Sequence, residues 1–125
     1  MTLLRSAALA VLSLALNIPA AAAQPAGPTI LIWSFGFYPH PIQLAAGREV
    51  TLAFVNRSGS SHDFTAKTFF ASSRIIRGDV GEGEVELKPY ETKTVTLIPR
   101  AGSYGAHCNH FFHKQLGMSD QIIVL

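Results

Sequence analysis

Short runs of alternating apolar and polar residues, each ended by a turn signal, constrain the fold of this chain more than any other feature. Apolar residues recur at every second position within 49–56, 84–87, 93–98 and 120–125. Glycine or proline separates many of the runs, as in Gly81-Glu82-Gly83 and Lys88-Pro89. A period of two sends successive side chains to opposite faces of a strand, so these runs predict β-strands with one buried face.

The spacing of these runs predicts the architecture. Short strands that recur about every 8–12 residues are typical of an all-β sandwich or a Greek-key barrel, and about 100 residues is a normal domain size for it. A helical turn is expected only within residues 72–79, and Trp33 is expected to pack in the core.

Residues 1–23 have the composition of a secretory signal peptide. Arg5 is followed by a mostly apolar stretch over 7–18, and Ala21-Ala22-Ala23 gives a small-residue cleavage pattern before Gln24. Because a membrane span needs about 20 apolar residues, no stable membrane insertion is expected. We therefore expect a signal peptide over 1–23 and one periplasmic domain over 24–125. Removing 23 residues, including Arg5, from 125 residues of charge +2 leaves 102 residues of charge +1.

The lone cysteine, Cys108, excludes several classes of site. One thiol cannot form an intrachain disulfide, the usual structural zinc site or an iron–sulfur cluster held by this chain alone. The scattered basic residues and small net charge argue against nucleic acid as a partner. No catalytic dyad is evident, so the chain is not expected to be an enzyme. A lone thiol in an exported protein requires another explanation.

That explanation is a cluster of metal-binding residue types within 104–118. The segment holds the only cysteine, three of the five histidines, and Met118, the one methionine besides Met1. Four residues separate Cys108 from His113 and His113 from Met118. A thiolate, an imidazole and a thioether together favour copper, and two histidines, one cysteine and a weak axial methionine form a blue-copper site. We predict that Cys108, His113 and Met118 are copper ligands.

The fourth ligand must come from elsewhere, and His62 is the candidate because it follows an alternating strand and a turn. The alternative is a histidine in a surface turn. His110 competes with His113, but one residue between Cys108 and His110 is too tight a spacing for trigonal geometry. His107 is adjacent to Cys108 and is expected to point to the opposite face of the strand.

In its proposed ligands and their order, the sequence resembles a cupredoxin, a small blue copper protein of the plastocyanin and azurin type. The resemblance spans nearly all of 28–125 and rests on short motifs as well as on the proposed ligands: Phe37-Tyr38-Pro39, Ile42-Gln43-Leu44, Gly47, Val50-Thr51-Leu52, Asn56, Leu87-Lys88-Pro89-Tyr90-Glu91-Thr92 and Gly102-Ser103-Tyr104. Tyr90 stands where glycine is commoner. The first half is also similar to cupredoxin-like domains of periplasmic iron-uptake proteins.

The resemblance implies a Greek-key sandwich of about eight strands, with one copper ion held at one end by His62, Cys108, His113 and Met118. It implies one-electron transfer between redox partner proteins by a monomer that cycles between Cu(I) and Cu(II). In relatives, the ligand that matches His113 has an edge near solvent inside an apolar ring. Phe111 and Phe112 could supply that ring, or they could pack in the core.

The resemblance also assigns a role to the residue after the first histidine. In many relatives that residue is an asparagine that ties the two ligand loops together, and here it is Asp63. Its carboxylate is expected to accept hydrogen bonds from backbone N–H groups of the cysteine loop. The alternative is a solvated turn residue.

Other functions are consistent with parts of the pattern. The run around Cys108 resembles the terminal loop of multicopper oxidases, but Asn109 replaces a histidine there and 102 residues cannot hold the other domains. The main alternative is a periplasmic copper-handling or metal-handling protein, for binding, delivery or uptake, without an electron-carrier role. The surplus histidines His40, His107 and His110 would suit a second, labile copper site. A copper-free structural module is a third possibility.

Overall fold

In the computed structural model, residues 15–20, 26–110 and 118–125 are described. Residues 15–20 are exposed and have no regular secondary structure. The remaining described residues form ten strands, one α-helix and one short 3-10 helix: β1 Ala26–Trp33, β2 Gly36–Tyr38, β3 Ile42–Leu44, β4 Val50–Asn56, β5 His62–Thr65, α1 Lys67–Ser72, β6 Arg74–Arg77, η1 Gly81–Gly83, β7 Glu84–Leu87, β8 Thr92–Ile98, β9 Gly102–His107 and β10 Ser119–Val124.

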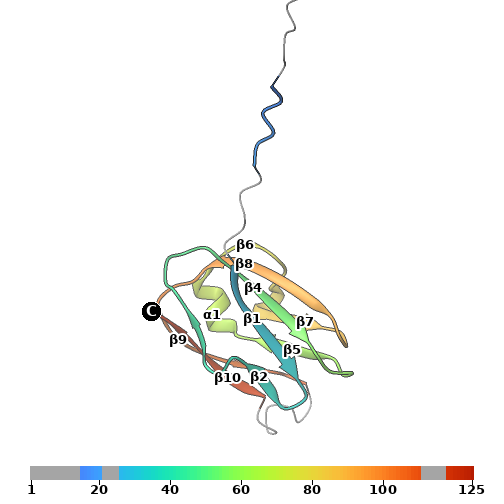
Figure 1. Cartoon of the computed structure of the whole chain (residues 1–125). Coiled ribbons are helices and arrows are strands. Elements are labelled where there is room, and N and C mark those ends of the chain that lie inside the picture. The colour runs from blue at the N-terminus through green and yellow to red at the C-terminus, as the bar shows by residue number, and fades with distance from the viewer. Residues whose placement is uncertain (1–14, 21–25, 111–117) are drawn as a thin grey trace, which may run out of the picture.

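The strands form two five-stranded sheets (Figure 1). One sheet has the order β2-β1-β4-β8-β6, and the other has the order β3-β10-β9-β5-β7. Strands far apart in sequence are neighbours, because β1 pairs in parallel with β4 and β3 pairs in parallel with β10. The all-β sandwich predicted from the alternating runs is confirmed.

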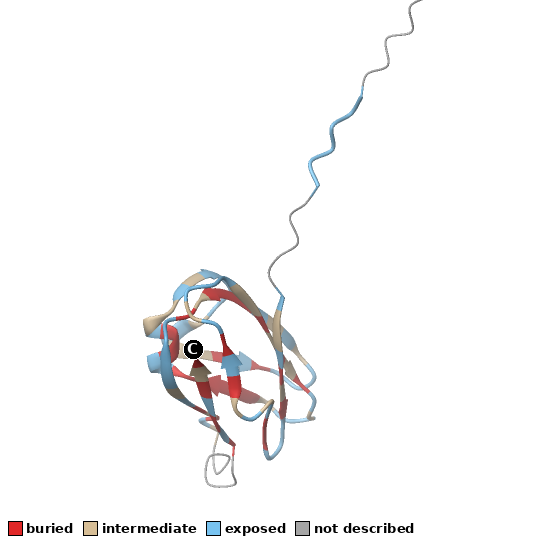
Figure 2. Ribbon diagram, turned by 60° about the vertical axis from the view of Figure 1, so that its left-hand side comes forward, coloured by how far each residue is buried: buried red, intermediate tan, exposed pale blue. Residues whose placement is uncertain are grey.

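The core lies between the inner faces of the two sheets, where Figure 2 shows the buried residues. Buried positions alternate along the strands as the sequence predicts: Leu52 and Phe54 in β4, Val85 and Leu87 in β7, Val95 and Leu97 in β8, and Ile122 and Val124 in β10. Phe64 of β5 lies at the centre, and its ring is 5.2 Å from that of Phe37 and 5.0 Å from that of Phe54, between ring centroids. The two sheets are therefore held together chiefly by apolar contacts.

Three expectations differ from the structure. Among the described residues there are ten strands instead of about eight, because β2 and β3 have three residues each and are too short to show alternation. The helical turn expected within 72–79 is wrong, because β6 occupies Arg74–Arg77 and pairs with β8, whereas the helix covers Lys67–Ser72. Residues Phe69 and Phe70 are the buried part of that helix.

Trp33 is also not a core residue, because it remains 48% exposed. It ends β1 opposite Gly36, and its ring contacts Phe35 at 5.7 Å between ring centroids. Ile30 and Ile32 take the buried positions of β1, so the alternation of that strand turns Trp33 outward.

In the turn between β7 and β8, Tyr90 adopts a backbone conformation that is unusual for a residue other than glycine. The Glu91 N–H donates to the Lys88 carbonyl oxygen at 3.1 Å, and Tyr90 has a φ of 59°. This left-handed conformation favours glycine, so Tyr90 stands at a position where glycine would fit without strain.

Among the described residues, no helix is long and apolar enough to cross a membrane.

Candidate metal centre

Three of the four predicted ligands lie at the ends of adjacent strands. His62 is the first residue of β5, Cys108 follows β9, and Met118 precedes β10, in a sheet where β10, β9 and β5 are neighbours. The Cys108 N–H donates to the Met118 carbonyl oxygen at 3.1 Å. All three side chains are fully buried. His113 lies outside the described residues. The fold therefore brings the His62 segment beside the Cys108 segment, although 46 positions separate the two residues in sequence.

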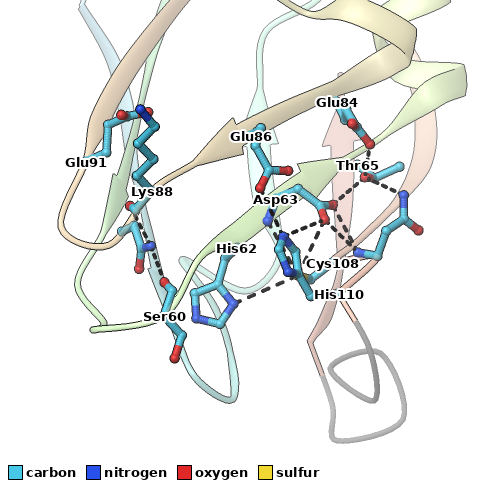
Figure 3. A network of polar contacts seen from close by, with 12 residues as sticks. Ser60, His62, Asp63, Thr65, Glu84, Glu86, Lys88, Glu91, Cys108 and His110 are labelled. Carbon is cyan, nitrogen blue, oxygen red and sulfur yellow. Dashed lines mark hydrogen bonds and ion pairs between the residues drawn. The ribbon is translucent and has the colours of Figure 1, made fainter.

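The side chains of His62 and Cys108 face each other (Figure 3). The His62 Nδ1 atom lies 3.9 Å from the Cys108 Sγ atom. Metal–thiolate and metal–imidazole bonds in proteins are about 2.3 Å and about 2.1 Å, so two such bonds at about 120° separate S from N by about 3.8 Å. This spacing and the soft donor set fit a copper ion bound by both atoms.

The protein environment of Cys108 controls its proton. Burial is the largest influence and raises the pKa of the Cys108 thiol, and the nearby Asp63 carboxylate acts in the same direction. Backbone N–H groups of Asp63 and His110 oppose this shift, and the Asp63 N–H lies 3.5 Å from Sγ. Without a cation the buried thiol keeps its proton, so thiolate formation is coupled to metal binding.

Asp63 joins the two segments that carry His62 and Cys108. Both of its carboxylate oxygens lie 3.0 Å from the Asn109 N–H, and the Thr65 hydroxyl donates to one of them at 2.5 Å. The Asn109 side-chain amide donates to the Thr65 hydroxyl oxygen at 3.0 Å. Asp63 is 2% exposed, so it is not a solvated turn residue. Its carboxylate accepts the backbone hydrogen bond from the cysteine segment that the sequence predicted.

A second set of hydrogen bonds orients the His62 ring. The His62 Nε2 atom lies 2.8 Å from the Ser58 hydroxyl oxygen. The Asn56 amide NH2 donates to the Ser60 and Lys88 carbonyl oxygens, so its own oxygen faces Ser58. That oxygen accepts from the Ser58 N–H and hydroxyl, both at 3.0 Å.

The Ser58 hydroxyl has one proton, and two oxygens, that of the Asn56 amide and the Ser60 carbonyl, lie within 3.1 Å to accept it. A Ser58 hydroxyl that donates to one of these oxygens accepts hydrogen bonds through its lone pairs, from the Ser60 N–H at 3.3 Å and from an N–H at His62 Nε2. With the proton on Nε2, the lone pair of His62 is on Nδ1, the atom that faces Cys108. The turn after β4 thus presents the correct ring nitrogen to a metal.

The remaining histidines occupy different surroundings. His107 bonds through Nε2 to the Asn109 side-chain oxygen at 2.8 Å. His110 follows Cys108 by two residues, and its Nε2 atom lies 3.1 Å from a carboxylate oxygen of Glu86. His40 is an exposed side chain that contacts the buried carboxylate of Asp120. Of the three surplus histidines, His110 is the one that the structure brings beside a buried carboxylate of the Cys108 site.

Sequence reasoning did not find Ser58 or Glu86. The pattern Asn56-Arg57-Ser58-Gly59-Ser60 directly after an alternating strand is a signal for a side-chain-stabilised turn, and it could have suggested Ser58. Glu86 gives no comparable signal, because its contact with His110 joins residues 24 positions apart.

Comparisons with known proteins agree with the fold. The sequence model of the Cupredoxin-like domain family matches residues 6–124. A comparison with curated protein sequences finds no match. Among solved structures, auracyanin B superposes with a TM-score of 0.60 at 17% identity over 84% of this chain and 92% of its own. The dithionite-reduced auracyanin of Roseiflexus castenholzii has a TM-score of 0.58 at 16% identity, over 84% and 99% of the two chains.

A multicopper oxidase from Campylobacter jejuni, described as a metallo-oxidase, superposes with a TM-score of 0.63 at 14% identity over 87% of this chain. The match spans only 32% of the oxidase. These identities show a shared fold, and the family match covers nearly the whole sequence. The chain therefore belongs to the Cupredoxin-like domain family.

Proposed function

We propose that this protein is an exported, periplasmic copper protein that carries single electrons between redox partner proteins and is not itself an enzyme. The observation that carries the proposal is the buried pair of His62 Nδ1 and Cys108 Sγ, 3.9 Å apart at the ends of two adjacent strands. Met118, which directly precedes β10, would provide a thioether, and His113 would provide the second imidazole. Bound at these residues, copper would supply one-electron chemistry between Cu(I) and Cu(II).

The chain's own residues suit this role because they hold the donors in place. His62 and Cys108 are anchored by Ser58 and Asp63, and burial keeps bulk water away from the thiol. A site that is already assembled needs little rearrangement when its charge changes by one. Export is supported by the composition of residues 1–23.

The test is copper reconstitution of the exported protein, followed by an absorption spectrum and a metal count. We expect one copper ion per chain and the intense blue colour typical of cupredoxins. A colourless protein that binds only Cu(I), or that exchanges copper readily, would contradict the carrier role and favour metal handling. A protein that binds no copper would favour a structural module.

Replacing Ser58 by alanine is expected to weaken copper binding by about 10–100-fold, the usual effect of losing a hydrogen-bond partner of a ligating histidine. The reason is that His62 loses the acceptor that keeps its proton on Nε2. The measurements are copper affinity and the ring ¹⁵N chemical shifts of His62 in the metal-free protein. Ser60→Ala is the matched control, because the Ser60 backbone oxygen makes the contacts in this turn. Equal effects of the two variants would contradict the prediction.

Replacing Met118 by leucine is expected to leave copper bound but to raise its reduction potential. Methionine is the weak axial ligand of blue-copper sites, and the axial ligand tunes the potential. Leucine has a similar volume, so the fully buried position stays filled. Redox titration of both proteins checks this result. An unchanged potential would show that Met118 is not a ligand.

A further inference from the structure

Beside the Cys108 site, three side chains from separate segments converge on a common point. Asp63 of β5, Glu86 of β7 and His110 each offer one donor atom, and these atoms all lie within 4.8 Å of one another. The His110 Nε2 atom is 3.1 Å from Glu86 Oε1 and 3.6 Å from Asp63 Oδ2. Figure 3 shows the Glu86 and His110 side chains directed toward Asp63. The cluster uses neither the His62 ring nor the Cys108 sulfur as a donor.

These distances match those between two atoms that bind the same metal ion. Bonds of about 2.1 Å from a metal to imidazole nitrogen and carboxylate oxygen, at angles between about 95° and about 120°, separate the donors by about 3.1–3.6 Å. The distances of 3.1 Å and 3.6 Å from His110 Nε2 lie within this range. An ion could therefore replace the hydrogen bond between His110 and Glu86 with small side-chain adjustments.

The backbone holds two of the donors in fixed relation. Asp63 and Glu86 are directly opposite each other in the antiparallel pair of β5 and β7. The Asp63 carboxylate is held further by Asn109 and Thr65. The Glu86 and His110 side chains are 51% and 33% exposed, so solvent reaches the cluster from one side. This arrangement leaves room for water to complete the coordination of an ion.

Charge favours a divalent cation at this point. Two carboxylates surround one imidazole, and a proton on His110 would neutralise only one of them. A divalent ion bound to neutral imidazole would neutralise both, including the buried carboxylate of Asp63. An imidazole with carboxylates suits Zn²⁺ or Cu²⁺, whereas Ca²⁺ and Mg²⁺ prefer oxygen ligands and Cu⁺ prefers sulfur.

We propose that Asp63, Glu86 and His110 form a second metal site, adjacent to the copper centre and sharing none of its four proposed ligands, that binds a Zn²⁺-type divalent cation with water as the remaining ligand. Asp63 Oδ2 also lies 3.8 Å from Cys108 Sγ, so the two sites are close neighbours. The sequence had suggested the surplus histidines His40, His107 and His110 for an additional copper site. The structure keeps only His110 of these and adds Asp63 and Glu86, because the described contacts of His107 and His40 are with Asn109 and Asp120.

The first test uses the full chain carrying Cys108→Ala, which removes the thiolate that could also bind zinc. Isothermal titration calorimetry with Zn²⁺ is expected to show one zinc-binding site per chain. Adding Glu86→Gln to this background is expected to weaken zinc binding by at least about tenfold, since it removes a charged ligand. Glu84→Gln is the matched control: Glu84 lies two residues earlier on β7 and contacts Thr65 instead of His110. Zinc binding should survive that change.

A second measurement keeps the test valid if Cys108→Ala fails to fold. In the copper-loaded natural sequence, added Zn²⁺ should bind at one site per chain without displacing copper, and Glu86→Gln should remove that binding. Absence of zinc binding in every folded background, or equal loss in Glu86→Gln and Glu84→Gln, would overturn the second site. The zinc titration of Cys108→Ala requires no copper. Its result therefore tests the second site even if the proposed copper centre binds no copper.

Discussion

Replacing Cys108 by alanine is expected to abolish the blue colour and to weaken copper binding by more than about a hundredfold, beyond the effect of losing a supporting hydrogen bond. Cys108 provides the only thiolate in the chain, and its sulfur is the donor that faces His62 Nδ1. No other residue could supply the thiolate sulfur that blue-copper sites require. The absorption spectrum and the copper content of the purified variant check this prediction.

The control for this variant is the stability of the metal-free protein. A buried cysteine without a metal acts as a small apolar side chain, so its loss is expected to change the free energy of unfolding by about 1 kcal/mol. Urea unfolding of the metal-free natural sequence and of Cys108→Ala measures that difference. If the variant stayed folded, kept its copper and remained blue, Cys108 would not be the central ligand.

Replacing Phe64 by alanine is expected to lower the free energy of unfolding by about 3–5 kcal/mol, the usual range for a buried phenylalanine. Phe64 is fully buried, and its ring lies beside Phe37 and Phe54 of the opposite sheet and Phe70 of the helix. Its removal would leave a cavity that several elements share and that none can fill by a small movement. This loss is a large fraction of the stability of a small domain.

Phe35→Ala is the matched control, because Phe35 is an aromatic side chain that remains 60% exposed. Its contact with Trp33 lies outside the core, so the free energy of unfolding is expected to fall by less than about 1 kcal/mol. Urea unfolding curves for the two variants, fitted with a common slope, give the comparison. A smaller loss in Phe64→Ala than in Phe35→Ala would show that the centre of the fold lies elsewhere.

The elements that sequence reasoning predicted well are those whose pattern is local. In β4, β8 and β10 the period of two is long enough to identify both the strand and its buried face. The helical turn expected within 72–79 failed because Arg74–Arg77 is too short to show a pattern and becomes a strand through its pairing with β8. Trp33 shows the same limit, since hydrophobicity alone favoured burial and the strand's alternation turned it outward.

In the candidate metal centre too, some residues could be predicted from the sequence and others only from the structure. Residue types and their order predicted Cys108 and Met118 as ligands, and the position of His62 after a strand suggested the distant imidazole. The structure adds contacts that sequence reasoning did not find, which are those of Ser58 with His62 and of Glu86 with His110. The turn sequence after β4 is a local signal for Ser58, but the Glu86 contact joins residues 24 positions apart and no local signal marks it.

By itself, the sequence determined that this is a β-rich domain with one thiol, and that its soft donors are of the kind copper prefers. Those conclusions follow from periodicity and chemistry, which each residue carries regardless of its distant neighbours. The tertiary structure alone decided which nitrogen of His62 faces Cys108 and which acid faces His110. Both depend on strand pairing, because the order β10-β9-β5-β7 places side chains from distant parts of the chain within a few ångströms of one another.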